Sequence, residues 1–208
     1  DEAVQAFRDT LRLSPNFFEA YTGIGRAYIN SNRNQEAIEP LKNAGYHSIL
    51  AGVANVSPRA DTFRTKYLRE LGEAFDVKID AAEDMDLYLR FSRLFPIYCN
   101  NHVALKYRKH QSNWSGIHGA TKTLRSILSL LDKQKQFIAE NNELLTAHRI
   151  GIKHWKALLG PGCVGELITS IKVRNTRFTI QVFSFLLTKC PNILFKTLFN
   201  KVVMRVRK

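Results

Sequence analysis

The sequence feature that most constrains the fold is a repetition of residue types near the N-terminus. A shift of 34 residues places Ala3 over Ala37 and Phe7 over Leu41, and this interval is the period of a repeated pair of antiparallel helices. Residues 1–44 also have helical periodicity. The segment is therefore predicted to form stacked helices whose small and apolar side chains meet in a shared seam.

Residues 20–44 resemble one complete tetratricopeptide repeat (TPR). The resemblance rests on small, aromatic and aliphatic positions: Ala20, Tyr21, Ile24, Gly25, Tyr28, Ala37, Leu41 and Ala44. It implies that Gly25 and Ala37 let the two helices approach closely, and that Asn32 adopts the left-handed conformation in the turn. Residues 1–15 resemble the second helix of an earlier repeat. Because one and a half repeats bury too little core, we expect further repeats upstream, and a protein partner or a spacer role for them.

A second constraint is a cluster of carboxylates in the middle of the chain. Glu83, Asp84 and Asp86 fall within four residues and Arg90 follows them. One interpretation is the acidic first turn of a surface helix, in which Asp86 pairs with Arg90. The other is a site for proton transfer, because neighbouring carboxylates repel and the pKa of one rises. Asp84-Met85-Asp86 is also formally a D-x-D metal signature, but a helical pattern follows it, which favours the carboxylate-pair interpretation.

The residues on either side of this cluster resemble a known family. The matching positions are Phe63-Arg64, Leu68, Leu71-Gly72, Phe75-Asp76, Glu83-Asp84, Asp86-Leu87, Leu89-Arg90, Tyr107-Arg108-Lys109-His110, Asn113 and Ser115. In order and spacing they resemble the second, acceptor-side half of a bacterial family 2 glycosyltransferase of GT-A type, over residues 48–140.

The resemblance implies inverting transfer of a sugar from a nucleotide-sugar to a hydroxyl group of a glycan, a lipid-linked saccharide or a protein. The general base of the family corresponds to Asp84. Glu83 and Asp86 would raise the pKa of Asp84, and Arg90 would hold one carboxylate in place.

The same resemblance assigns a second group of residues to the leaving diphosphate or to its metal ion. His110, with Arg108 and Lys109 beside it, is the candidate contact and the candidate metal ligand, while Asn113 and Ser115 would shape the loop. The alternative for His110 is a surface or capping residue. A complete domain of the family uses Mg²⁺ or Mn²⁺, but residues 1–60 resemble none of its donor-binding half. We therefore expect this chain to lack that half, to bind no cation firmly and to be inactive alone.

Net charge restricts the partners. The chain has a formal net charge of +13 and a pI of about 9.9, which favours an anionic partner, and residues 166–208 contain nine basic side chains and one acidic side chain. Residues 193–206 have the pattern of a basic interfacial helix at an anionic membrane surface, or of an ordinary packing helix.

No nucleic-acid module, P-loop, dinucleotide-binding or zinc motif is recognised, and no nucleic-acid partner is predicted. Three separated cysteines, Cys99, Cys163 and Cys190, favour a reducing compartment.

These inferences predict a helix-rich α+β or α/β chain in four parts. Residues 1–45 form the TPR segment and residues 46–60 a linker with a short strand around 48–56. Residues 61–142 form a partial glycosyltransferase domain, with strands at 95–97 and 103–107 and a helix at 121–142.

Residues 143–208 form a helical basic tail, whose first helix is predicted to end at Gly160-Pro161-Gly162. The predicted location is the cytoplasm, at the inner face of the membrane. Two functions stay open: a glycosyltransferase, or a non-catalytic TPR-containing interaction module with a remnant transferase domain.

Overall fold

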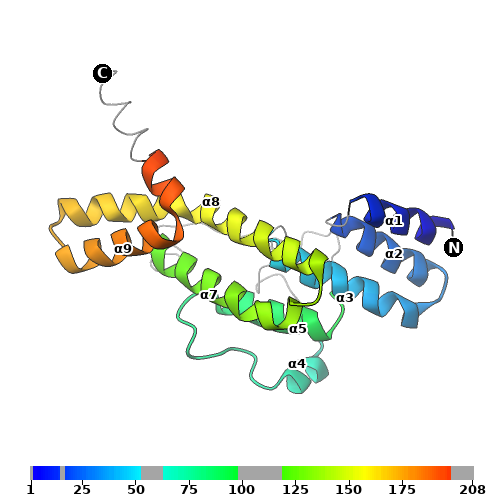
Figure 1. Cartoon of the computed structure of the whole chain (residues 1–208). Helices are drawn as coiled ribbons and strands as arrows, with labels where there is room; N and C mark the ends of the chain where they lie inside the picture. The colour runs from blue at the N-terminus through cyan, green and yellow to red at the C-terminus, as the bar shows by residue number, and fades with distance from the viewer. Residues whose placement is uncertain (1, 15–16, 53–62, 98–118, 198–208) are drawn as a thin grey trace, which may run out of the picture. The chain divides into compact units, whose positions relative to one another are not determined.

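A computed structural model describes residues 2–14, 17–52, 63–97 and 119–197 of the chain (Figure 1). These residues form helices joined by turns, and no β-strand occurs among them. The chain divides into two compact units: Asp1–Tyr107 with Leu130–Gly151, and Arg108–Ser129 with Ile152–Lys208. The predicted helix-rich character is confirmed.

The first unit begins with three helices, α1 (Glu2–Leu13), α2 (Phe18–Asn30) and α3 (Asn34–Leu50). Consecutive helices pack on each other, and their seam buries five side chains: Val4, Ile24, Tyr28, Ala37 and Leu41. The predicted helical hairpin is therefore present, and four of these five residues are among those expected in its seam.

Two residues determine how closely α2 and α3 approach. A Cβ atom on Gly25 would lie 2.6 Å from Cδ2 of Leu41, so only glycine fits at this crossing. Asn32, in the turn between the helices, has a φ of 59°, the left-handed conformation that Asn tolerates better than most residues. Both expectations from the sequence are confirmed.

The predicted linker at 46–60 is wrong in its first part, because α3 continues to Leu50. Tyr46, Ile49 and Leu50 are buried, and burial of apolar side chains favours continuing the helix over starting a strand. Gly151 makes this contact close, since a Cβ there would overlap the carbonyl oxygen of Leu50. Residues 48–50 are thus helical instead of the predicted strand, and 53–60 lie outside the described residues.

The middle of the first unit holds α4 (Thr65–Leu71) and α5 (Glu83–Leu94). Gly72 ends α4 with a φ of 83°, as its position in the sequence predicts. The strand predicted at 95–97 is absent: Phe95 has extended backbone angles, but its N–H bonds to the carbonyl of Phe91 at 2.8 Å. That donor closes the helix end and is not available to a sheet. The strand predicted at 103–107 lies outside the described residues.

Helix α7 (Ala120–Ile138) agrees with the helix predicted at 121–142. Its second half belongs to the first unit, where Leu130, Leu131 and Ile138 are buried. The hydroxyl of Tyr46 donates to Oε1 of Gln134 at 3.0 Å, which satisfies two polar groups in this interior.

Helix α8 (Asn142–Lys172) runs through Gly160-Pro161-Gly162 without ending, so the predicted stop there is wrong. In the second unit, a Cβ on Gly160 would lie 2.8 Å from Cδ1 of Ile193, and one on Gly162 would lie 2.8 Å from Cβ of Ala120. The two glycines therefore serve close packing. Burial of Cys163 and Val164 directly after them offsets the helix-breaking tendency of proline.

The second unit is completed by α9 (Thr176–Lys189) and a short helix, Pro191–Thr197. Its core lies between α7, α8 and α9 and is made of apolar side chains and both described cysteines: Leu124, Cys163, Val164, Leu167, Val182, Phe185, Leu186, Cys190 and Leu194. Within the described part of the chain, no individual helix combines the length and apolar composition needed to cross a bilayer. The last part of the predicted basic tail, residues 198–208, lies outside the described residues.

Candidate functional site

The predicted carboxylate cluster forms the N-terminus of α5. Ala82, with φ 64° and ψ 32°, turns the chain into the helix and makes no side-chain cap. Glu83, Asp84 and Asp86 then occupy the first turn, where the positive end of the helix dipole favours negative charge. The three carboxylates are thus at one helix end, but their environments differ.

Asp86 is a structural carboxylate. It is 6% exposed, and its Oδ2 accepts from Nε of Arg90 at 2.7 Å. The same guanidinium donates to the carbonyl oxygens of Glu73 at 2.8 Å and Ala74 at 2.7 Å. The Asp86–Arg90 pair therefore fixes the segment before α5 to the helix, as a charge-assisted hydrogen-bond network.

Asp84 faces a different environment. Its side chain is partly exposed, and its Oδ1 accepts from the backbone N–H of Met85 at 2.8 Å. Burial raises the pKa of Asp84 above its ordinary value, and the charge of Glu83 adds to the increase. Asp84 therefore combines access to solvent with a raised proton affinity.

An aromatic cluster supports α5 from the side of α4. The ring of Phe63 lies 5.9 Å from that of Tyr88 and 5.0 Å from that of Phe91, and Tyr67 stacks on Phe95 at 4.5 Å between ring centroids. Aromatic pairs at these distances contribute beyond their buried area. Phe63, one of the positions of the family resemblance, thus helps to orient the carboxylate-bearing helix.

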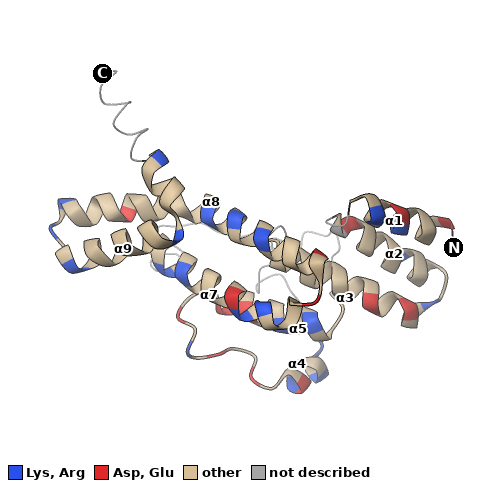
Figure 2. Ribbon diagram, in the orientation of Figure 1, with Lys and Arg blue, Asp and Glu red and all other residues tan. Residues whose placement is uncertain are grey.

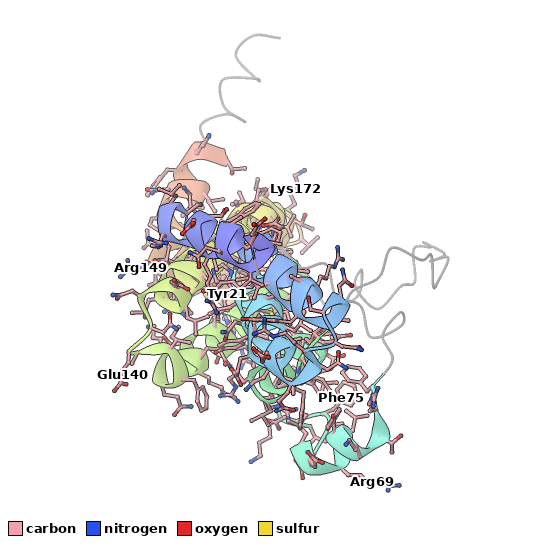
Figure 3. The ribbon with its side chains drawn as sticks, turned by 90° about the vertical axis from the view of Figure 1, so that its right-hand side faces the viewer. Tyr21, Arg69, Phe75, Glu140, Arg149 and Lys172 are labelled. Atoms are coloured by element: carbon pink, nitrogen blue, oxygen red, sulfur yellow. The ribbon has the colours of Figure 1, made fainter. Side chains whose placement is uncertain are left out.

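The other matching positions before α5 lie in the segment between α4 and this helix. Oδ1 of Asp76 accepts from the backbone N–H of Lys78 at 2.9 Å, a local turn that Asp side chains commonly form. Phe75, labelled in Figure 3, is about half exposed. Phe75 and Asp76 therefore belong to the turn that precedes α5. The hydrogen bond described for Asp76 is local and does not involve the α5 carboxylates.

The predicted diphosphate and metal residues, Arg108, Lys109, His110, Asn113 and Ser115, lie outside the described residues. Among the residues that the structure does describe, no group of three or more His, Cys, Asp or Glu side chains could hold a metal ion. In particular Asp86, the second carboxylate of the formal D-x-D signature, is bound to Arg90.

Sequence patterns did not identify two further contacts near the site. The guanidinium of Arg93 lies 3.5 Å from the ring centroid of Phe137, and burial lowers the pKa of Arg93. Arg90 reaches two backbone carbonyls 16 and 17 residues away. Neither contact has a sequence signal, because each joins segments separated by turns whose path is set by packing.

A cavity of about 730 Å³ lies elsewhere in the first unit, between α1 and α2. Apolar groups on Val4, Phe7 and Ala27 line it together with charged Glu19 and Arg26. None of the α5 carboxylates contributes to its lining. The first unit thus presents two separate features, a carboxylate whose pKa is raised and a groove.

Comparisons of the chain with models of known protein families, with curated proteins and with solved structures find no match.

Proposed function

We propose that this chain carries the general-base segment of an inverting glycosyltransferase, with Asp84 as the base. The observation that carries the proposal is that Asp84 and Asp86 have different environments. Asp86 is neutralised by Arg90, whereas the pKa of Asp84 is raised by burial and by Glu83. A base with raised proton affinity that remains reachable is what the abstraction of a hydroxyl proton requires.

In the proposed reaction, the acceptor hydroxyl oxygen attacks the anomeric carbon of the donor sugar. The new C–O bond forms as the bond to the diphosphate breaks, and the electron pair leaves with the diphosphate. The hydroxyl proton passes to a carboxylate oxygen of Asp84. Arg90 acts as a positioning residue, because it holds Asp86 and the segment before α5.

The proposed role is limited to the acceptor side. Residues 1–60 resemble none of the family's donor-binding half, so groups outside this resemblance must bind the nucleotide-sugar. We propose that His110, with Arg108 and Lys109, contacts the diphosphate or a divalent cation. Asn113 and Ser115 would support that loop.

The test uses a protein that joins this chain to a donor-binding half, because the chain alone is expected to be inactive. It measures nucleoside diphosphate released from a panel of nucleotide-sugars, with Mg²⁺ or Mn²⁺ and saccharide acceptors. We expect acceptor-dependent release that falls by roughly 10²–10⁴-fold in Asp84→Asn, as for loss of a general base. The control is Glu70→Gln, an exposed carboxylate on α4. Release that persists in Asp84→Asn would contradict the base assignment, and absence of release from every donor would favour the second function.

The second function is a non-catalytic module that binds a polypeptide partner through the α1–α3 hairpin. The groove between α1 and α2, which is lined by both apolar and charged side chains, favours it. Ala3→Glu would place a charge in the groove and should abolish partner binding. Glu2→Gln, on the same helix but outside the groove lining, should not. This function predicts that Asp84→Asn leaves partner binding unchanged.

A further inference from the structure

Helix α9 has two apolar faces, and among the residues that the structure describes only one of them is packed. Val182, Phe185 and Leu186 are buried in the core of the second unit. Ile180, Phe183 and Leu187 follow the i, i+3, i+7 spacing of a single helix face, and they are 63%, 46% and 45% exposed. We call these three residues the outer α9 face.

Exposed apolar side chains continue around the turn that joins α8 to α9. Ile171 and Val173, at the end of α8 and just after it, are 58% and 66% exposed. The two helices lie side by side (Figure 1), and Oγ1 of Thr179 donates to Oγ of Ser170 at 2.9 Å. The exposed apolar groups therefore belong to a hairpin whose two helices are joined by a hydrogen bond.

The charge on this hairpin has one sign. Residues 167–197 contain five basic side chains and no Asp or Glu: Lys172, Arg174, Arg177, Lys189 and Lys196. Figure 2 shows basic residues at both sides of the α8–α9 turn, and Lys172 is labelled in Figure 3. The nearest preceding acid, Glu166, accepts from the backbone N–H groups of Ala120 and Thr121, so its charge is directed to the start of α7.

We propose that the outer α9 face binds the surface of an anionic lipid bilayer. Ile180, Phe183 and Leu187 would enter the acyl-chain boundary, while Arg174 and Arg177 contact headgroup phosphates. The composition fits this position: α9 and Pro191–Thr197 together are as apolar as a membrane span, but a bend of 114° separates them. Because of this bend the pair does not form one straight span, and an interfacial position would bury the exposed apolar face of α9.

Charge also argues against a second copy of this chain as the occupant. A symmetric contact through the outer α9 face would bring the basic flanks of two copies together, and like charges across an interface oppose association. An anionic bilayer supplies both the apolar layer and the negative charge. The proposal does not depend on the sugar transfer proposed above.

The experiment is flotation of the full chain with vesicles of phosphatidylcholine, with and without phosphatidylserine. We expect binding to the anionic vesicles that weakens with added salt. The variant Ile180→Ser/Phe183→Ser/Leu187→Ser should lose at least about tenfold in vesicle affinity. The control Leu13→Ser/Val77→Ser removes apolar groups of the first unit that are even more exposed, at 90% and 93%, and should bind unchanged.

Charge is tested separately, so that the proposal does not depend on one variant. Arg174→Gln/Arg177→Gln/Lys189→Gln should weaken binding by roughly tenfold or more. The control Arg64→Gln/Arg69→Gln/Lys78→Gln removes the same charge from exposed positions of the first unit. In Phe183→Trp, the added indole should show a blue-shifted emission with anionic vesicles, which reports insertion.

Four outcomes would overturn the proposal. The first is full vesicle binding by the outer-face serine variant. The second is loss of binding in Phe199→Ser/Val202→Ser/Val203→Ser alone, which would assign the membrane contact to the tail. The third is a dimer in light scattering that only the outer-face variant converts to a monomer. The last is a loss of RNA binding, without a loss of vesicle binding, in the variant Arg174→Gln/Arg177→Gln/Lys189→Gln.

Discussion

Two carboxylates separated by one residue have opposite roles at the start of α5. Asp86 is buried and paired with Arg90, which in turn holds the carbonyls of Glu73 and Ala74. Asp84 accepts from the backbone N–H of Met85, and burial raises its pKa. Removing the charge should therefore have different consequences at the two positions.

Asp86→Asn should lower the free energy of unfolding by roughly 1–3 kcal/mol, because Arg90 loses a charged acceptor in a buried setting. Asp84→Asn should not lower this free energy at neutral pH. A carboxyl whose folded pKa is raised stabilises the fold below its unfolded pKa, and that stabilisation is lost as the pH rises through the folded pKa. At neutral pH the ionised Asp84 thus costs stability, which asparagine removes.

Urea denaturation of both variants, with circular dichroism as the readout, measures the two free energies. A carboxyl-detected NMR titration gives the pKa of Asp84 directly, which should lie above 3.8 and should fall in Glu83→Gln. Equal destabilisation by the two asparagine variants would contradict the division of roles.

At the scale of helices, glycine and proline have meanings that depend on their neighbours. Gly72 ends α4, but Gly160 and Gly162 lie inside α8, where each faces another side chain. Pro40 and Pro161 also lie inside helices. The local tendency of these residues to break helices is overcome where the following turn buries apolar groups.

Gly25→Ala should destabilise the first unit by about 1–3 kcal/mol, because the added Cβ overlaps Leu41 and the core is already closely packed. Gly165→Ala is the matched control: a Cβ there meets no atom within 4 Å. It should stabilise α8 by roughly 0.5–1 kcal/mol through helix propensity. Thermal unfolding measures both, and a stabilising Gly25→Ala would contradict the described α2–α3 contact.

The first turn of α7 depends on a residue from another helix. Glu166 on α8 accepts hydrogen bonds from the N–H groups of Ala120 and Thr121, which have no partner within their own helix. Glu166→Ala should cost about 1 kcal/mol, as for loss of an N-cap. Glu140→Ala, at an exposed position after α7, should change the denaturation midpoint little; an equal effect of both would contradict the cap.

At the scale of the whole chain, polar contacts between distant residues close the first unit. The hydroxyl of Tyr21 donates to Glu143, 122 residues away, and that of Tyr46 donates to Gln134, 88 residues away. Burial raises the pKa of both phenols, and Glu143 adds to the increase at Tyr21. For Tyr46 the pKa rises from 10.0 to about 12.

These shifts predict loss of stability in alkali. Because the folded pKa of Tyr46 is raised, its contribution is complete below pH 10, the unfolded value, and is lost as the pH rises through about 12. Tyr46→Phe should be less stable at neutral pH by about 1 kcal/mol, but its stability should fall less between those pH values. Tyr67→Phe, in α4, is the control, and urea midpoints against pH are the measurement. Parallel pH profiles for Tyr46→Phe and the unmodified chain would contradict the role of this phenol.

The sequence predicted much of the first helical hairpin and part of the site. Helical period, small residues at crossings and the tolerance of Asn32 for a left-handed turn are local properties, so α2 and α3 followed from them. The ion pair of Asp86 and Arg90 also followed from a local property, their i,i+4 spacing on a helix. The strand predicted at 95–97 was wrong, and the one predicted around 48–56 was wrong over 48–50, because short apolar runs fit a strand and a buried helix end equally well.

Amino-acid sequence alone determined which segments become amphipathic helices, where α4 ends, and that the carboxylates share one helix terminus. These outcomes depend on interactions within a few residues of the chain. Tertiary structure alone decided that α3 extends to Leu50, that α8 passes through Pro161, and that burial raises the pKa of Asp84. Each of those depends on atoms distant in sequence, whose burial and hydrogen bonds outweigh local preference.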